Sequence, residues 1–410
     1  MVNWLSFSQM SGSGDTDVTV TASSYSDLVE RTTNLQLSGV SKSVIIPVTQ
    51  YGIYNPHPED YYSNYLTFQI LTGGTIVWCC QEGNSEYQKT VEYRINGGNW
   101  ISITSKQPTG PSSAKTIDAS CVFNVSSGDV IEWRGYNTTY AKDDGYYYCC
   151  CFKGRNEDNG YGGTAKYNVY GNIMSLVYGD NFLNNNVLPT SYTFSSLFVA
   201  SNAVACENLV LPATSLTKAC YCWMFQGSNS LLTAPELPAT ELHDMCYNMM
   251  FAFCDSLVIP PTVLPATSIV LRNGVYPSYC YSAMFENCFS LTRIPDIKLK
   301  RSVGRYTLSN MFVGCTSLTK VYLAFDYRPD YEHAYIGNNG AYHMFDGCSN
   351  LSEITCLARP SFTYWTSVSR DWVNGVSATG VFYKNSKSTW TRGSDGIPEG
   401  WTVIDVDVEW

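Results

Sequence analysis

The feature that most constrains the fold is a repeat in the second half of the chain. The stretch "CYNMMFAFCDSL" (Cys246–Leu257) recurs as "CYSAMFENCFSL" (Cys280–Leu291). A unit of this length cannot bury its apolar face alone, so the copies must stack on one another to form a core. The repeat therefore predicts a solenoid of about six units, whose other copies are "SSLFVASNAVACENL" (Ser195–Leu209), "CYCWMFQGSNSL" (Cys220–Leu231), "LSNMFVGCTSL" (Leu308–Leu318) and "YHMFDGCSNL" (Tyr342–Leu351).

The order of motifs within a copy predicts its local structure. We expect a helical turn that ends in Met–Phe, then a tight turn, Cys-x-x-Leu, and a short strand such as "LTKVYLA" (Leu318–Ala324). The Met–Phe pairs follow one another at steps of 26, 34, 27 and 33 residues, at Met224, Met250, Met284, Met311 and Met344.

The cysteines of the repeat are expected to be core residues. A zinc site uses cysteines or histidines at short spacing together with a second pair, whereas the paired cysteines here lie eight residues apart. Ser228 and Thr307 replace a cysteine in single copies, which would destroy a metal site or a disulfide. We therefore predict no metal and no cofactor. A free cysteine behaves as a small apolar residue, and a serine in its place needs a backbone partner, so we expect inward packing at Cys254, Cys288, Cys315 and Cys348.

The repeat resembles the BspA-type leucine-rich repeat over about 160 residues, including Met-Phe-x-x-Cys-x-x-Leu and the recurrent "LPAT". This resemblance implies a solenoid over residues 191–360 that presents an extended surface for recognition. Residues 361–410 break the period, and we expect them to cap the last open face of the core. The tryptophans expected to pack in this cap are Trp365, Trp372, Trp390 and Trp401.

Residues 1–50 contain short alternating segments between glycine turns, which predicts strands. The segments are "DVTVTAS" (Asp17–Ser23), "TNLQLSG" (Thr33–Gly39) and "SVIIPVTQ" (Ser43–Gln50), and they follow Trp4. The arrangement resembles the BACON domain, an immunoglobulin-like β-sandwich of proteins from gut Bacteroidetes and their phages, the crAss-like phages among them. The resemblance implies a spacer or a glycan- or mucin-binding module. We favour a spacer, because no aromatic platform remains once Trp4 is assigned to the core.

Residues 51–65 are rich in Tyr and Pro and are expected to form a linker. Six or more strand-like segments follow in residues 66–190, separated by Gly, Asn and Asp turns, and they predict a second β-sandwich of jelly-roll type. The turn Asn96–Gly98 is a strong hairpin signal. The chain as a whole is therefore expected to be mainly β.

Composition narrows the range of partners. A net charge of −10 argues against binding to nucleic acid or to anionic lipid. No segment approaches the roughly 20 apolar residues of a membrane span, so we expect no membrane insertion. The start "MVNWLSFSQMSGSG" (Met1–Gly14) lacks the features of a signal peptide, and if Met1 is the native start, we expect no export by the general secretory pathway. The alternative is a signal that precedes Met1.

Cysteine usage bears on the compartment in which the chain folds. Cys79–Cys80 and Cys149–Cys151 lie in strand-like runs, where neighbouring side chains point to opposite faces and cannot easily share one ion. Sixteen cysteines without a disulfide pattern indicate folding in a reducing cytoplasm.

No catalytic constellation is recognisable, and we predict that the protein is not an enzyme. The four histidines are scattered. Asp129 and Glu132 are the only plausible carboxylate pair for glycoside hydrolysis, whereas Asp143–Asp144 and Glu157–Asp158 have the character of turn formers. The loop Gly154–Gly163 matches neither a calcium loop nor a phosphate loop.

These features favour a non-enzymatic structural and adhesion protein of a phage particle: a fibre, spike or capsid decoration at the virion surface. The N-terminal domain would contact other virion proteins, and the repeats would bind a host-surface or mucin glycan or protein. Resemblance to virion appendages implies a homo-oligomer, commonly a trimer. The alternatives are a bacterial cell-surface adhesin and a glycan-degrading enzyme. The candidate ligand-binding residues are aromatic side chains in polar loops, Tyr140, Tyr146, Tyr161, Tyr331 and Tyr335.

Overall fold

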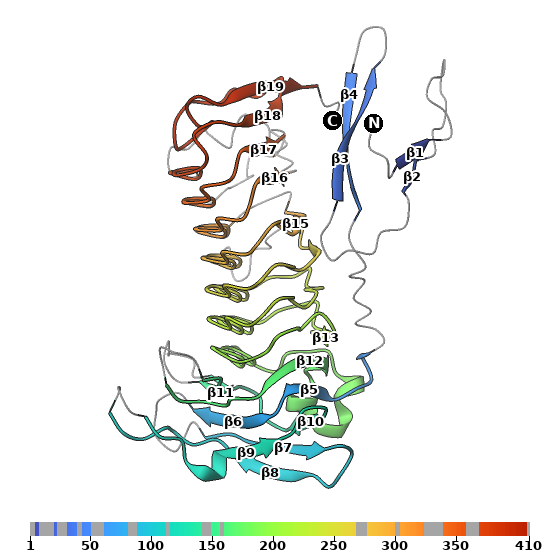
Figure 1. Cartoon of the computed structure of the whole chain (residues 1–410), viewed down its shortest axis with the longest axis vertical. Helices are drawn as coiled ribbons and strands as arrows, with labels where there is room; N and C mark the ends of the chain where they lie inside the picture. The colour runs from blue at the N-terminus through green and yellow to red at the C-terminus, as the bar shows by residue number, and fades with distance from the viewer. Residues whose placement is uncertain are drawn as a thin grey trace. The chain divides into compact units, whose positions relative to one another are not determined.

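The chain divides into two compact units, Met1–His57 and Pro58–Trp410 (Figure 1). The structure is a computed structural model, and it describes residues 5–7, 20–22, 31–38, 43–50, 61–80, 88–111, 115–141, 149–155, 160–267, 277–299, 304–323, 339–357 and 369–407.

The first unit contains two antiparallel pairs of strands. β1 (Leu5–Phe7) pairs with β2 (Val20–Ala22), and β3 (Arg31–Ser38) pairs with β4 (Ser43–Gln50). The last three of these strands overlap the three segments in which the sequence predicts strands. Trp4, which the sequence assigns to the core of this unit, lies outside the described residues.

The second unit begins with two packed β-sheets. The larger sheet has the strand order β13-β12-β5-β10-β7-β8, and the smaller has the order β11-β6-β9. Aromatic rings fill the space between them, since Phe152 of the smaller sheet lies 4.8 Å from Phe68 and 4.6 Å from Trp133 of the larger. The strands are β5 (Leu66–Thr72), β6 (Gly74–Cys80), β7 (Thr90–Ile95), β8 (Ile101–Thr104), β9 (Val122–Val125), β10 (Val130–Gly135), β11 (Cys150–Phe152), β12 (Lys166–Asn172) and β13 (Leu209–Val210).

The predicted hairpin at Asn96–Gly98 is confirmed. Asn96 and Gly97 have φ angles of 52° and 72°, which Asn and Gly accept more readily than other residues. β7 and β8 pair in antiparallel fashion on either side of this turn. Helical structure is scarce in the described residues and consists of α1 (Ser175–Tyr178) and the 3-10 turns η3 (Ala119–Cys121) and η4 (Gly179–Asn184).

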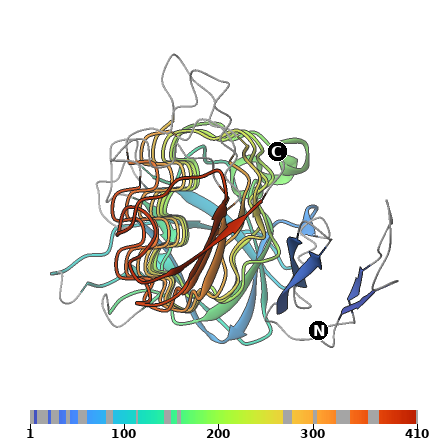
Figure 2. The same ribbon diagram turned by 90° about the horizontal axis from the view of Figure 1, so that it is seen from above.

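Beyond these sheets the chain winds into a series of coils, named here the coil stack. Each coil has a segment of consecutive turns and, on the opposite side, an extended segment (Figure 1). Viewed from above, the coils lie over one another (Figure 2). The turn segments in the described residues are 191–200, 218–227, 244–253, 279–287, 305–314, 339–347 and 369–375.

The turn segments are not α-helical, so the predicted helical turn is wrong. The amide of Phe225 donates to the Met250 carbonyl of the next coil at 2.8 Å, whereas the amide of Met224 donates to Tyr221 of its own coil at 3.3 Å. This alternation continues along the segment, so half of the amides join coils and half close turns. A residue with positive φ at every fourth position prevents a continuous helix.

The extended side of the coil stack contains short parallel strands, two of them in the segments "LTRIPDI" (Leu291–Ile297) and "LTKVYLA" (Leu318–Ala324), where the sequence predicts strands. β14 pairs with β15, and β16 to β19 form a four-stranded parallel sheet. The strands are β14 (Val263–Leu264), β15 (Asp296–Ile297), β16 (Lys320–Leu323), β17 (Glu353–Cys356), β18 (Val381–Asn385) and β19 (Thr402–Val406).

Tryptophans close the C-terminal end of the core, as predicted for this segment. Trp372 is fully buried and accepts a hydrogen bond from the amide of Phe345 at 2.8 Å, so it occupies the place of the repeat Met in a further coil. Trp390 stacks on Trp372 at 5.7 Å, and Trp401 is buried beside them. The coils therefore continue past residue 360. Trp365 lies outside the described residues.

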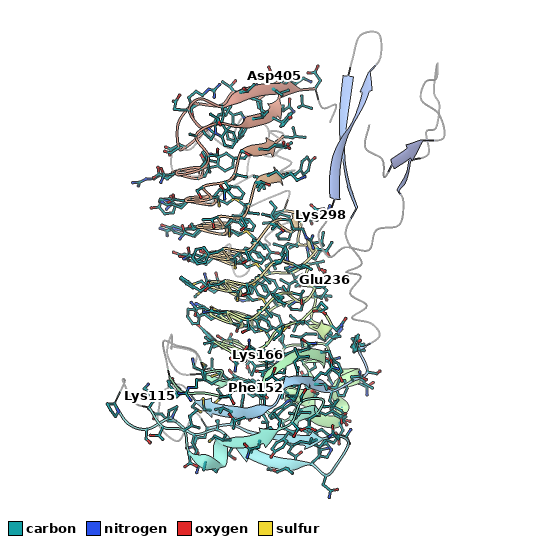
Figure 3. All side chains as sticks on the ribbon, viewed as in Figure 1. Lys115, Phe152, Lys166, Glu236, Lys298 and Asp405 are labelled. Carbon is teal, nitrogen blue, oxygen red and sulfur yellow. The ribbon has the colours of Figure 1, made fainter. Side chains whose placement is uncertain are left out.

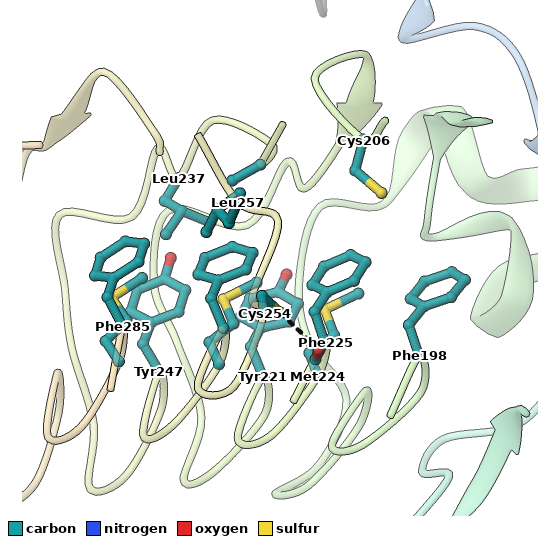
Figure 4. Packing of buried hydrophobic residues seen from close by; sticks show 14 of the residues in the cluster. Phe198, Cys206, Tyr221, Met224, Phe225, Leu237, Tyr247, Cys254, Leu257 and Phe285 are labelled. Atoms are coloured by element: carbon teal, nitrogen blue, oxygen red, sulfur yellow. Dashed lines mark hydrogen bonds between the residues drawn. The ribbon is translucent and has the colours of Figure 1, made fainter. Parts of the chain in front are cut away.

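Stacked aromatic rings run along the coil stack (Figure 4). Phe225 lies 5.1 Å from Phe198 and 5.6 Å from Phe251, with nearly parallel ring planes. Phe198 also lies 5.5 Å from Phe152, so the two sheets and the coil stack share one hydrophobic core. The fully buried rings form one column of Phe198, Phe225, Phe251, Phe285, Phe312 and Phe345 and a second column of Phe194, Tyr221, Tyr247 and Tyr281.

The repeat cysteines are core residues, as predicted, and all 16 cysteines of the chain are buried thiols. Cys254 donates to the Phe225 carbonyl of the preceding coil at 3.1 Å (Figure 4). Ser228, which replaces this cysteine one coil earlier, donates its hydroxyl to the Phe198 carbonyl at 2.8 Å. The serine therefore has the backbone partner that its burial requires. The same thiol–carbonyl bond recurs at Cys288, Cys315 and Cys348.

Substitution within the ring column should be far more costly than substitution beside it. We expect Phe285→Ala to lower the free energy of unfolding by about 3–5 kcal/mol, because it leaves a cavity between two rings. The matched control is Phe289→Ala, since Phe289 is 46% exposed, and its loss should stay below about 1 kcal/mol. Urea unfolding followed by circular dichroism measures both values. Equal losses would contradict a dominant role for the column.

Candidate binding surfaces

Tyr140 is a core residue rather than a surface ligand contact. It is 1% exposed, and its hydroxyl donates to the Leu176 carbonyl at 2.6 Å. Its ring meets Trp78 edge-on at 5.6 Å. Burial raises the pKa of its phenol. The polar sequence around Tyr140 therefore gives no indication that this residue is buried.

Tyr161 is partly exposed, and two ammonium groups lie near its ring. Nζ of Lys115 and Nζ of Lys153 are each 5.8 Å from the centre of its ring. Lys115 lies at the edge of the two-sheet region (Figure 3). These cations favour the negative face of the ring. Tyr146, Tyr331 and Tyr335 lie outside the described residues.

The carboxylates Asp129 and Glu132 have structural partners. Asp129 accepts hydrogen bonds from the Ser126 amide at 2.7 Å and from Asn96 Nδ2 at 2.9 Å, and these bonds lower its pKa. Glu132 forms a bidentate ion pair with Arg94, with N–O distances of 2.7 and 2.9 Å. Both groups therefore stabilise a turn or a strand pair.

A cluster of charged and aromatic side chains covers part of the larger sheet on the face away from its core. The guanidinium carbon of Arg94 lies 4.7 Å from the centre of the Trp100 ring, and that of Arg134 lies 4.3 Å from it. Arg134 bonds Glu92 at 2.7 Å and Asp180 at 2.8 Å. Because both arginines are paired with carboxylates, Arg94 with Glu132 and Arg134 with two others, this cluster is best explained as a structural network. Sequence reasoning missed Trp100, although it directly follows the predicted hairpin turn.

A different surface lies on the turn segments. There, large apolar residues have positive φ angles, which are unfavourable for them. In the third turn segment these residues are Met245, Met249 and Phe253, with φ angles of 54°, 52° and 60°. Left-handed backbone costs a non-glycine residue about 1–2 kcal/mol. Phe253 is also 39% exposed. Five residues with positive φ make up what we call the apolar turn surface: Trp223, Met245, Met249, Phe253 and Tyr279.

Apart from Tyr306, which stacks on Tyr279 at 4.8 Å, the later coils use different residues at the equivalent positions. Asn310, Gly314, His343 and Gly347 have positive φ, and Asn, Gly and His tolerate this conformation better than large apolar residues do. His343 is held at 2.5 Å from Asp346, within the framework of its coil. The contrast between early and late coils shows that the coil geometry does not demand apolar side chains.

Glu286 is one of the carboxylates that border the apolar turn surface. The backbone amide of Phe253 donates to the Glu286 carbonyl at 2.7 Å, which places Glu286 on the adjoining coil. Its side chain is partly buried, and burial raises its pKa. Burial disfavours the ionised form of this carboxyl, whereas a cation beside it would favour that form.

The signal that could have revealed this surface was present in the sequence. Trp223 and Met249 directly precede the repeated Met, and Phe253 follows Phe251 by two residues. Because a helical turn was expected, the four-residue spacing of residues with left-handed backbone was not recognised.

In the described part of the chain, no cluster of three or more His, Cys, Asp or Glu residues could hold a metal ion. The helices described there are too short or too polar to cross a membrane. Residues 2–51 match the family model described as "BACON: Putative binding domain, N-terminal". No curated protein and no solved structure matches the chain.

The ion pair at Asp180 should make stability dependent on pH. Hydrogen bonds from Arg134 and Tyr65 lower the pKa of Asp180, so its contribution is present above the unfolded pKa of about 4 and is lost as pH falls through the lower folded pKa. We expect Asp180→Asn to cost about 0.2–1 kcal/mol near neutral pH, and the difference from wild type to shrink in acid. Urea unfolding at neutral pH and in acid measures this difference in the free energy of unfolding. The exposed Glu399→Gln is the control, and a difference that grows in acid would contradict the assignment.

Proposed function

We propose that this chain is a non-enzymatic adhesion protein of a phage particle, which recognises its target through the coil stack. The observation that carries the proposal is the apolar turn surface. Its residues occupy left-handed positions that Asn and Gly fill elsewhere in the stack, and Phe253 and Tyr279 are each 39% exposed. Side chains that combine backbone strain with exposure are typical of binding sites.

We infer that the coils are leucine-rich repeats of BspA type. The Met-Phe-x-x-Cys-x-x-Leu pattern and the parallel pairing of successive coils support this assignment. Stacked rings and coil-to-coil hydrogen bonds hold the surface residues in fixed positions. A preorganised surface loses little conformational entropy on binding, which suits recognition.

The ligand classes that suit this surface are proteins and glycans of the host surface or of mucin. Aromatic and Met side chains are enriched at protein interfaces, and aromatic rings also pack against the apolar faces of sugars. Glu286 supplies a carboxyl group on the coil that adjoins Phe253, through the hydrogen bond between the two backbones. We favour a ligand with exposed apolar groups and a nearby positive charge.

The structural roles of Asp129 and Glu132 support a function without catalysis. The virion assignment is supported by the 16 cysteines, which are all thiols and suit synthesis in a reducing host cytoplasm. In this proposal the BACON-like domain at residues 2–51 contacts other virion proteins, and the assembled appendage is a homo-oligomer, with a trimer as one arrangement.

Binding should depend on the apolar turn surface but not on the polar coils. We expect the double variant Met249→Asn, Phe253→Asn to bind host cells and mucin-coated surfaces at least tenfold more weakly, with its fold retained because Asn accepts positive φ. The control is Asn310→Gly, at an equivalent position of a later coil. Surface plasmon resonance measures binding, and thermal melting verifies folding. Unchanged binding by the folded double variant would refute the proposed surface.

The location is tested by mass spectrometry of purified phage particles and, separately, of host outer membranes. We expect peptides of this chain, including its N-terminal peptide, in particles. A processed or lipid-modified form confined to membranes would instead identify a bacterial adhesin. Turnover of a host glycan that is lost in Glu132→Gln would favour the glycan-degrading enzyme.

A further inference from the structure

Two cysteines of the packed sheets lie directly opposite each other. Cys80, at the end of β6, is the register partner of Cys150, at the start of β11. Their Sγ atoms are 3.0 Å apart. Both residues are almost completely buried, at 2% and 0% exposed. The pair is separated by 70 residues in sequence, so only the tertiary fold brings it together.

The backbone geometry at this pair suits a covalent cross-link. The amides of Cys80 and Cys150 bond elsewhere, to the carbonyls of Lys106 and Tyr140, so neither amide joins the two residues. In such a non-hydrogen-bonded antiparallel pair the Cα atoms lie about 4.5 Å apart and the side chains approach closely. A disulfide spans Cα distances of about 4.4–6.8 Å. The two strands therefore need no rearrangement for a bond to form.

The neighbouring cysteines form a separate group on the other face of the same sheet. Cys79, Cys149 and Cys151 pack with Val77 and Val199, whereas Cys80 and Cys150 belong to the main core. This division follows from the alternation of side chains along each strand. The alternative cross-strand pair on that face, Cys79 with Cys151, makes a matched comparison.

We propose that Cys80 and Cys150 are an oxidation site that closes to a disulfide when the protein passes from the reducing compartment of synthesis to an oxidising one. The co-reactant is a low-molecular-weight disulfide. The thiolate of one cysteine attacks this disulfide, forms a mixed disulfide and releases one thiol. The other cysteine then attacks the mixed disulfide and releases the second thiol. Two protein thiols are oxidised, the small disulfide is reduced by two electrons, and both protons leave with the released thiols.

Local electrostatics and strand position support reaction at this pair. The hydrogen bond from Cys150 lowers the pKa of Cys80, which favours the attacking thiolate. β11 has three residues and stands at the edge of its sheet. The outer edge of β11 donates the amides of Cys150 and Phe152 to neighbouring carbonyls, so the small disulfide reaches the pair through local opening of these hydrogen bonds. Ser105 Oγ lies 3.0 Å from Cys80 and also accepts the Lys89 amide, so it keeps a partner after oxidation.

The test uses the full chain, purified under reducing conditions and incubated with glutathione disulfide. Free thiols are then alkylated in denaturant, and the digested protein is analysed by tandem mass spectrometry. We expect one linked peptide pair that has lost two hydrogen atoms, with fragment ions that join Cys80 to Cys150. Complete alkylation of both cysteines, or a link between Cys79 and Cys151, would overturn the proposal.

Two variants separate the pair from its neighbours. Cys79→Ser should still form the link and show a higher melting temperature after oxidation, because the cross-link restricts the unfolded chain. Cys80→Ser should show neither change. A melting temperature that rises equally in Cys80→Ser would count against the assignment. If Cys80→Ser does not fold, fragment ions of the wild-type chain still decide which cysteines are joined. The outcome does not depend on the adhesion function, since no ligand is present.

Discussion

The contact between one coil and the next is the interaction on which the second unit depends. Each coil buries a Phe against the Phe of its neighbour at 5.1–5.6 Å and donates alternate amides to the neighbour's carbonyls. A coil by itself leaves both an apolar face and open hydrogen-bonding groups, and only another layer can satisfy them. Each end of the stack therefore needs a cover, which the packed sheets provide at one end and the terminal tryptophans at the other.

This arrangement separates the residues that make the fold from those that are available for binding. Side chains at Met250, Phe251 and Cys254 face the core and are fully buried. Some left-handed positions, such as Phe253 and Tyr279, are exposed on the same turn segments, and the residues at these positions differ from coil to coil. Since the coil-to-coil hydrogen bonds are made by the backbone, these positions can vary without loss of the core. A repeat protein can change its specificity in this way without loss of its core.

Cysteine serves two physical purposes in this chain. In the coil stack the thiol is small enough to pack inside and is still a donor for the carbonyl of the preceding coil, as the equivalence of Cys254 and Ser228 indicates. In the sheets, adjacent cysteines on paired strands place thiols on both faces, and register puts the Sγ atoms of one cross-strand pair 3.0 Å apart. Both groups are buried, and they differ in that the register of the strands brings Cys80 and Cys150 within reach of each other.

The sequence by itself determined the features that rest on local pattern. The period of Met–Phe and Cys-x-x-Leu revealed the repeat, the Asn96–Gly98 turn revealed a hairpin, and the loss of Cys at Ser228 identified the cysteines as core. Tertiary structure alone decided that the turn segments are not helical, because left-handed backbone is stabilised by hydrogen bonds to a neighbouring coil. It also decided that Tyr140 is buried, that Phe253 is exposed and that Trp100 lies between two arginines. These outcomes depend on contacts between residues distant in sequence, which no local pattern records.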